Sequence, residues 1–106
     1  MDQQWNSMTV PAILGELGER VRKERLNQNQ TRANLARKAG LSLTVIARLE
    51  AGLGCNLGNL VQILRALDKL NHLDTFLPDP GFSPVQLARL RGRVRQRASS
   101  PRGNHA

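Results

Sequence analysis

Side chains that can bind a polyanion gather in one short stretch in the first half of the chain. Arg32, Arg37, Lys38 and Arg48 supply cationic donors there, and Thr44 adds a hydroxyl group. Guanidinium, ammonium and hydroxyl groups are the donors that contact phosphates and base edges in nucleic acids. The stretch therefore has the side chains for nucleic-acid binding, provided that the fold brings them to one surface.

The spacing of apolar residues in this stretch predicts two short helices joined by a tight turn. Thr31 and Ser42 are of the type that begins helices, so we expect helices over residues 32–39 and 43–51. Gly40 between them allows the positive φ that ends the first helix. Two such helices form a helix-turn-helix unit. The apolar contacts between them are expected from Leu35, Leu41, Ile46 and Leu49, and Ala36 is small where the two helices must cross closely.

The second of these helices leaves an outward face that a DNA major groove would meet. We assign Arg32 and Arg48 to the groove or to phosphate, and Thr44 to a base edge or a phosphate. Arg37 and Lys38 are either solvated or lie beside phosphates. The complete set of candidate DNA contacts is Arg32, Arg37, Lys38, Ser42, Leu43, Thr44, Val45, Ala47 and Arg48.

Two of these candidates are apolar. Leu43 and Val45 can offer only apolar contact, for instance to thymine methyl groups. Sequence reading by this face would therefore rest on few hydrogen bonds or on the shape of the DNA.

Apolar residues recur at helical spacing through the rest of the chain, and no stretch alternates convincingly as a strand would. We therefore predict an all-α protein in which five helices share one core. Ser83-Pro84-Val85-Gln86 has the form of a capping box, so a short sixth helix is predicted up to Gly92. The remaining predicted helices cover residues 10–26, 57–67, 72–77 and 84–91.

The length and charge of the chain fit one small domain with an anionic partner. The 106 residues include 40% hydrophobic residues and carry a net charge of +8, from 16 Lys and Arg against 8 Asp and Glu. We predict an N-terminal extension over residues 1–8, a DNA-binding domain over 9–77 and a basic tail over 78–106. Residues 93–106 have few large apolar side chains and are expected to be disordered when alone.

Several function classes are disfavoured. No apolar stretch approaches the roughly 20 residues needed to cross a bilayer, and no basic region followed by an apolar run opens the chain. The single Cys55 excludes an intrachain disulfide and a multi-cysteine zinc site, and it fits a reducing cytoplasm. His72 and His105 are isolated. We therefore expect a cytoplasmic protein without cofactor, metal or enzymatic activity.

Motifs from residue 17 to residue 77 resemble those of the Xre/Cro-type helix-turn-helix regulators, which are related to phage repressors. The resemblance implies a five-helix domain, usually a homodimer, whose second motif helix enters the major groove. This chain has Thr31-Arg32 where the family commonly has Thr-Gln, and apolar residues at two groove-facing positions. The matching segments are residues 18–22, 35–42, 46–52 and 60–67.

The resemblance also implies contacts away from the DNA. It implies a structural ion pair behind the reading helix, here between Arg25 and Glu50. The apolar residues near position 73 could belong to the core alone, or they could pack against a second copy in the symmetric dimer that a palindromic operator requires. These candidate dimer residues are Leu70, Leu73, Phe76 and Leu77.

The C-terminal run over residues 82–100 resembles the tail of a narrower group, the HipB proteins encoded beside HipA-type kinases in toxin-antitoxin operons. That resemblance implies autorepression of an operon and contact with a toxin kinase. We therefore expect a sequence-specific DNA-binding repressor. The alternative is an antitoxin subunit whose main role is to restrain or scaffold a kinase. A third reading is non-specific coating of RNA or membrane by the basic tail.

Overall fold

The structure is a computed structural model that describes residues 4–96, with side chains up to residue 92. Within those residues every regular element is a helix, so the all-α prediction is confirmed. The chain divides into two units, residues 1–76 and 77–106, which are described here one at a time. The division lies one residue from the predicted boundary between domain and tail. We call residues 4–76 the body and residues 77–96 the C-terminal segment.

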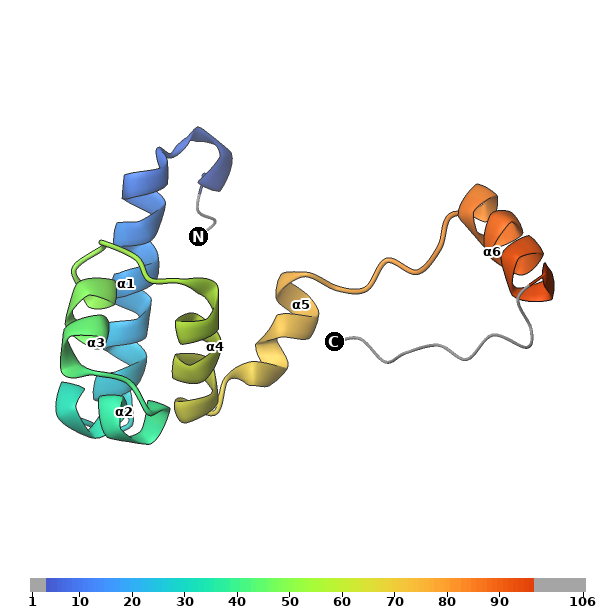
Figure 1. Ribbon diagram of the computed structural model, residues 1–106. Coiled ribbons are helices and arrows are strands. Elements are labelled where there is room, and N and C mark those ends of the chain that lie inside the picture. Colours follow the sequence, from blue (N-terminus) through green and yellow to red (C-terminus); the bar gives the residue numbers. More distant parts are fainter. Residues whose placement is uncertain (1–3, 97–106) are drawn as a thin grey trace. The chain divides into compact units, whose positions relative to one another are not determined.

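The body contains four helices of at least two turns and three shorter pieces (Figure 1). The predicted helix bounds in this region agree with the structure to within one residue, and the 3-10 turns η1 and η2 are additional elements. In chain order the elements are η1 (Trp5–Ser7), α1 (Val10–Asn27), α2 (Arg32–Ala39), α3 (Leu43–Glu50), α4 (Leu57–Ala66), η2 (Leu70–His72) and α5 (Leu73–Phe76).

The four main helices begin with the same side-chain cap. Thr9, Thr31, Ser42 and Asn56 each accept a hydrogen bond from the backbone N–H three residues further on, at 2.7 to 3.3 Å. Such a cap satisfies one of the backbone donors that a helix leaves free at its start. The sequence predicted the caps at Thr31 and Ser42, and these two are confirmed.

Each of the same four helices is followed, one or two residues after its last residue, by a residue with a left-handed backbone conformation, that is, a positive φ. After α2, Gly40 has φ of 71°, and Leu41 N–H donates to the Ala36 carbonyl at 2.9 Å. This pairing is the Schellman motif, which turns the chain sharply at a helix end. It places α3 directly after α2. The left-handed residues after the four helices are Asn29, Gly40, Gly52 and Asp68.

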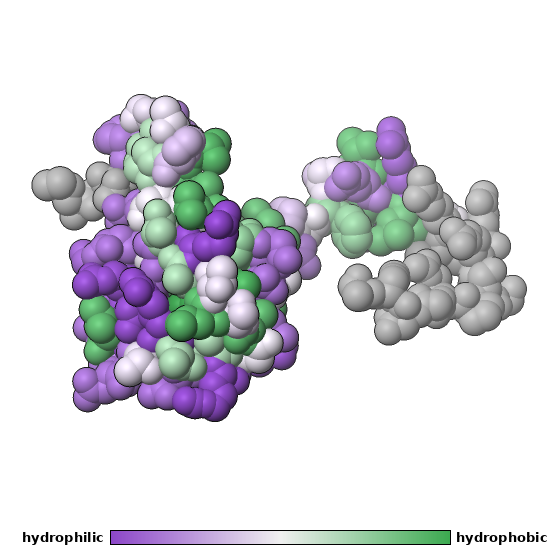
Figure 2. Space-filling view, turned by 60° about the vertical axis from the view of Figure 1, so that its left-hand side comes forward, coloured by the Kyte–Doolittle hydropathy of each residue, from purple (hydrophilic) through white to green (hydrophobic). Residues whose placement is uncertain are grey.

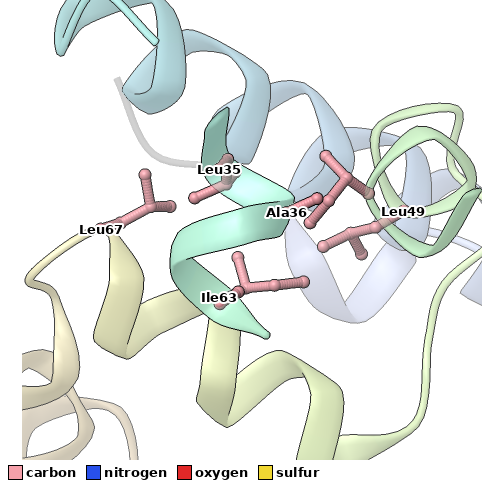
Figure 3. Packing of buried hydrophobic residues seen from close by; sticks show 7 residues of the cluster. Leu35, Ala36, Leu49, Ile63 and Leu67 are labelled. Atoms are coloured by element: carbon pink, nitrogen blue, oxygen red, sulfur yellow. The ribbon is translucent and has the colours of Figure 1, made fainter. Parts of the chain in front are cut away.

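Side chains from α2, α3 and α4 form the core of the body, and they point toward one another in Figure 3. Val21 of α1 packs against this cluster from one side. Burying a leucine or isoleucine stabilises a fold by about 1.5–3 kcal/mol. The buried apolar residues are Leu35, Ala36, Ala39, Ile46, Leu49, Ile63 and Leu67.

Helix α1 crosses α3 very closely at Gly18. A Cβ atom there would collide with the Leu49 carbonyl oxygen and would lie 3.1 Å from the Glu50 carbonyl oxygen. Only glycine leaves room for this approach, because the obstructing atoms are backbone atoms that cannot swing aside. The close crossing places Arg25, two turns further along α1, beside the end of α3.

The prediction of five helices around one core is wrong in one respect. The predicted short helix over residues 72–77 is present as the single-turn helix α5, which follows the 3-10 turn η2, but α5 has no buried residue and so does not share the core. Phe76 is 74% exposed. A helix of one turn cannot present an apolar stripe to the core, and Pro78 disfavours helical geometry at Leu77.

The C-terminal segment contains one helix, α6 (Pro84–Gln96). The predicted capping box is confirmed, because Ser83 Oγ accepts from Gln86 N–H at 3.2 Å and Gln86 Oε1 accepts from Ser83 N–H at 3.4 Å. The prediction that Gly92 ends the helix is wrong. Gly92 does not have the positive φ of a helix-ending glycine, and a glycine with helical φ and ψ only weakens a helix.

The disorder prediction for residues 93–106 is therefore wrong for residues 93–96, which lie in α6. Residues 97–106 lie outside the described part of the chain. Among residues 4–96, no helix has both the length and the apolar character that crossing a membrane requires.

The N-terminal extension begins with η1, which lies against α1. The Arg20 guanidinium stands 5.0 Å from the centre of the Trp5 ring, within the range of a cation–π contact. Arg20 Nε also donates to Glu16 Oε2 at 2.8 Å, one helical turn earlier on α1.

Candidate nucleic-acid interface

Helix α3 has two faces of different character. Ile46 and Leu49 are buried on the inner face. On the outer face Leu43 is 51% exposed, and Thr44 and Arg48 are also exposed. The remaining outer candidates, Val45 and Ala47, are half-buried. The body therefore holds α3 by one side and leaves the other side accessible.

The polar side chain in the turn before α3, that of Ser42, makes a hydrogen bond within the protein. Ser42 Oγ accepts the hydrogen bond from Val45 N–H at 3.3 Å, so one acceptor position of this candidate is occupied by the cap. Leu41 in the turn packs against the core. The turn is therefore anchored on the core at Leu41 and capped at Ser42.

The ion pair expected between Arg25 and Glu50 is present and doubly bonded. Arg25 Nε donates to Glu50 Oε2 at 2.7 Å, and Arg25 Nη2 donates to Glu50 Oε1 at 3.0 Å. The side chains are 8% and 1% exposed. Arg25 Nη1 also donates to the Gln30 carbonyl at 2.8 Å. This pair joins α1, the loop before α2 and the end of α3.

A second arginine shares the same carboxylate. Arg32 Nε donates to Glu50 Oε1 at 3.0 Å, while its side chain remains 48% exposed. We assigned Arg32 only to groove or phosphate, and this contact was missed. A sequence signal existed, since a cation at the first position of a helix opposes the helix dipole and needs a counter-charge.

The two arginines control the protonation of Glu50. Burial alone would raise the pKa of Glu50, but the hydrogen bonds from Arg25 and Arg32, with their positive charges, hold its pKa below the ordinary value. The hydrogen bond to Glu50 raises the pKa of Arg25 against the opposing effect of burial. The lowered pKa keeps Glu50 a carboxylate at neutral pH, where it accepts hydrogen bonds from both guanidinium groups.

The outward face of α2 carries two further cations. Arg37 donates from both Nη atoms to Asn34 Oδ1, at 3.1 and 2.9 Å, and Lys38 is exposed. Both residues line a shallow hollow of about 390 Å³ together with Gln28, Gln30 and Asn34. Gln30 Oε1 is buried there without a hydrogen-bond partner. Hydrophilic side chains cover much of the face of the body that Figure 2 presents.

The charged side chains of α2 and α3 differ in exposure, because the cations are exposed and the carboxylate is buried. Arg32, Arg37, Lys38 and Arg48 expose cationic groups on α2 and α3. The only carboxylate on these two helices, Glu50, is buried beneath them. An anion approaching α2 or α3 would therefore meet exposed cations and no exposed carboxylate of these two helices.

The apolar residues proposed for a dimer are mostly uncovered. Leu70 is half-buried, whereas Leu73 and Phe76 of the body are exposed. In the C-terminal segment Leu77 is exposed as well. The alternative that these residues belong to the core alone is therefore wrong for Phe76 and Leu77. Their contact with a second copy stays a prediction.

The other reactive side chains stand apart from this surface. Cys55 is exposed in the loop before α4, and partial burial raises the pKa of its thiol. His72 is exposed in η2, and His105 lies outside the described residues. In the described part of the chain, no group of three His, Cys, Asp or Glu residues is arranged to hold a metal ion.

No protein-family model matches the chain, and no curated protein is significantly similar to it in sequence. Its function is therefore inferred from its own residues.

Proposed function

We propose that the chain is a dimeric, sequence-specific DNA-binding transcriptional repressor that acts in the cytoplasm. In this proposal α2 and α3 form a helix-turn-helix unit of the Xre/Cro type, and α3 enters the major groove. The chain represses its own operon. It has no catalytic role, cofactor or metal of its own.

The observation that carries the proposal is the contrast between the two faces of α3. A helix held by Ile46 and Leu49, with Thr44 and Arg48 free on the other side, can enter a groove without losing its contacts to the core. The major groove of B-DNA admits one α-helix, and helix-turn-helix proteins insert the second helix of the motif in this way.

The exposed cations support contact with the DNA backbone on either side of that helix. Arg32, Arg37 and Lys38 lie on α2, which precedes the reading helix. Each phosphate that a cation neutralises releases counterions, so binding must weaken as the salt concentration rises. The net charge of +8 acts in the same direction.

The uncovered apolar residues after α4 support a symmetric dimer. Leu73 and Phe76 would pack against the same residues of a second copy. Such a dimer would place two α3 helices in successive major grooves, roughly 34 Å apart on a palindromic operator. Replacing Phe76 by aspartate should then yield monomers in analytical ultracentrifugation and weaken operator binding.

The deciding experiment is footprinting on the DNA upstream of the chain's own gene, with and without the product of the adjacent gene. We expect two protected half-sites about one helical turn apart. Protection should fall steeply between low and moderate salt. No protection and no mobility shift at low ionic strength would end the proposal.

Single substitutions separate base reading from backbone contact. Arg48→Ala should reduce the preference for operator over random DNA, whereas Arg37→Ala should weaken both and lower the salt dependence by about one phosphate. Arg65→Ala is the matched control, because Arg65 is also exposed and bonded to an amide three residues earlier, but lies on α4. Equal losses on both DNAs for Arg48→Ala and Arg37→Ala would contradict these roles.

A second candidate function is an antitoxin subunit that holds a HipA-type kinase. It is favoured by the C-terminal segment, where Phe82, Val85 and Leu87 are exposed beside Arg89 and Arg91. Figure 2 shows hydrophobic atoms on the surface of this segment. A basic helix with an exposed apolar side is typical of a segment that docks on a partner protein.

The second function is tested by co-expression with the neighbouring gene. A kinase that co-purifies with the chain, together with growth rescue by the chain when that kinase is toxic, would support it. Co-purification without rescue would assign neutralisation to another subunit. A chain truncated before residue 84 should lose the kinase and keep the operator.

A further inference from the structure

Two segments of this strongly charged chain contain no charged residue. Residues 4–15 and 51–64 lack Asp, Glu, Lys and Arg, although the chain has 16 basic and 8 acidic residues. The two segments meet where the loop after α3 crosses α1 (Figure 1). A Cβ atom on Gly52 would lie 3.0 Å from Gly15 Cα, and one on Gly54 would lie 3.5 Å from Leu14 Cδ1. The body therefore has one continuous uncharged surface at this crossing.

This uncharged surface exposes large apolar side chains. Leu57 is 73% exposed, Val10 is 69% exposed and Leu53 is 59% exposed. Val10 lies one turn before Leu14 on the same face of α1, so it stands on the side of the loop. None of the three exposed residues belongs to the core cluster. We call Val10, Leu53 and Leu57 the uncharged patch. An apolar patch without charges is typical of the centre of a protein interface.

The absence of charge favours a second copy of this chain as the occupant. Nucleic acid is disfavoured, because the patch has no cation that could neutralise a phosphate. A partner of different sequence can be attracted by complementary charge, which this surface does not offer. In a symmetric contact each residue near the axis faces its own equivalent, so any charge there would face a like charge. Two copies that each carry +8 avoid this repulsion at an uncharged surface.

The size of the patch indicates a weak contact. Stable interfaces bury about 800 Å² on each partner, and three partly exposed side chains alone supply less than that. The patch also lies on α1, the loop and α4, whereas the dimer contact of the proposed function uses α5. The patch is therefore suited to join dimers rather than to form them.

We propose that the uncharged patch binds the same patch of a second copy, in a weak symmetric contact that joins dimers to one another. Only the word dimers rests on the proposed function. The contact itself depends on the apolar side chains of Val10, Leu53 and Leu57 and needs no DNA.

Sedimentation equilibrium of the full chain without DNA, from about 10 μM to about 1 mM, measures this contact. Leu57→Glu is the disrupting variant, because symmetry places the two introduced carboxylates near each other in the interface. Leu57 is the first residue of α4 and follows the cap at Asn56. An acidic residue at this position suits the helix dipole, so the variant should fold, as circular dichroism can verify.

Two further variants serve as controls. Leu43→Glu is matched to the disrupting variant, since Leu43 is also the first residue of a capped helix and is 51% exposed, but lies on α3 outside the two uncharged segments. Leu57→Met keeps an apolar side chain in the patch. Neither control should change association in the absence of DNA.

We expect the wild-type chain and both controls to associate beyond the dimer as the concentration rises. Leu57→Glu should stay dimeric over this range, because its contact weakens by at least about tenfold. Phe76→Asp should be monomeric at about 10 μM and should pair when concentrated, whereas Phe76→Asp combined with Leu57→Glu should remain monomeric.

Salt provides a second measurement. Raising it from about 50 mM to about 300 mM screens the repulsion between two positively charged copies, so association through the patch should strengthen. DNA binding by the same chain should weaken over this range. Association that weakened with salt would mean that charge pairs hold the copies together, which would overturn the proposal.

Two other results would also overturn the proposal. A wild-type chain that does not associate beyond its low-concentration state would exclude a second copy as the occupant of the patch. Equal association of Leu57→Glu and the wild type would place the contact elsewhere. A wild-type chain that is monomeric at low concentration and pairs only when concentrated, with the pairing lost in Leu57→Glu, would support the patch and contradict the α5 dimer.

Discussion

The body and the C-terminal segment are both helical, but they are held in different ways. The four main helices of the body and α6 alike begin with a side-chain cap, as at Thr31 and Ser83. The body buries seven apolar residues, whereas no residue of the segment between 77 and 92 is buried. A cap fixes where a helix starts, and burial decides how firmly it persists, because isolated helices of this length are marginal in water.

The two regions also carry charge differently. Residues 4–76 hold ten Lys and Arg against six Asp and Glu, an excess of four over 73 residues, whereas residues 77–96 hold four Arg against one Asp, an excess of three over only 20 residues. In the body, Glu50 fixes the positions of Arg25 and Arg32. The segment has no acidic residue after Asp79. In the body, two arginines are therefore held in position by a buried carboxylate, whereas the arginines of the segment have no acidic residue near them in the sequence.

Amide hydrogen exchange should show the largest difference between the two regions. Exchange at Ile46 and Leu49 requires unfolding of the body, so it should be at least about a thousandfold slower, relative to unfolded rates, than at Leu87 and Leu90. Exchange is measured by NMR in the free protein. Similar protection in both regions would mean that the segment has a tertiary partner.

Glu50→Ala should strongly destabilise the body. Removing the buried carboxylate leaves the guanidinium of Arg25 buried without its counter-charge, at a cost of about 3–5 kcal/mol. Urea unfolding followed by circular dichroism measures this loss. Glu19→Ala is the control, since its pair with Arg22 is exposed at 3.4 Å and should contribute less than about 1 kcal/mol. Equal effects of the two substitutions would remove the structural role of the buried pair.

The same carboxylate should make the body sensitive to acid. The pKa of Glu50 is lower in the folded protein than its ordinary value of 4.5, so its contribution to stability is complete above that pH. The contribution is lost as the pH falls through the folded pKa. The advantage of the wild type over Glu50→Gln in urea midpoint should therefore shrink below about pH 4.5. A difference in urea midpoint between the two proteins that stays constant down to about pH 2.5 would contradict this prediction.

Gly18→Ala should destabilise the body, although alanine favours helices. The added Cβ meets the backbone carbonyl oxygen of Leu49, and overpacking of this kind costs about 1–3 kcal/mol. Gly15→Ala is the matched control, because no atom lies within 4 Å of its added Cβ. That variant should gain up to about 1 kcal/mol. Thermal unfolding of both proteins checks the difference, and a stabilised Gly18→Ala would contradict the close crossing.

Loss of a helix cap should lower stability least. In the C-terminal segment the loss should be confined to α6, whereas in the body it should affect the whole region. Ser83→Ala removes about 1 kcal/mol from α6, so exchange at Leu87 should accelerate about fivefold while exchange at Ile46 stays unchanged. Thr31→Ala deletes an equivalent cap from α2 and should lower the stability of the whole body. If Ser83→Ala also accelerated exchange at Ile46, the two regions would unfold together.

Much of the local structure could be predicted because it depends on neighbouring residues. The capping side chains Thr31 and Ser42 and the left-handed Gly40 act within a few residues of their own positions. The apolar spacing of α2 and α3 likewise identified the buried Ile46 and the exposed Thr44. These features follow from backbone hydrogen bonding and helical periodicity, both of which are visible along the chain.

The errors occurred where local signals were incomplete. Gly92 has the residue type that ends helices, but a glycine ends a helix only if its φ becomes positive, and here the helix continues to Gln96. The apolar residues of α5 have helical spacing, but Phe76 is exposed because one turn does not reach the core. The residue type shows which backbone conformations and which degree of burial are possible at a position, and the neighbouring structure decides which of them occurs.

The sequence by itself determined the helical class, the helix starts and the list of cations that can meet an anion. The tertiary structure alone decided that Arg32 shares Glu50 with Arg25 and that Gly18 admits α3 against α1. These contacts join residues far apart in the chain. Their existence depends on the packing angle between helices, which no local spacing encodes.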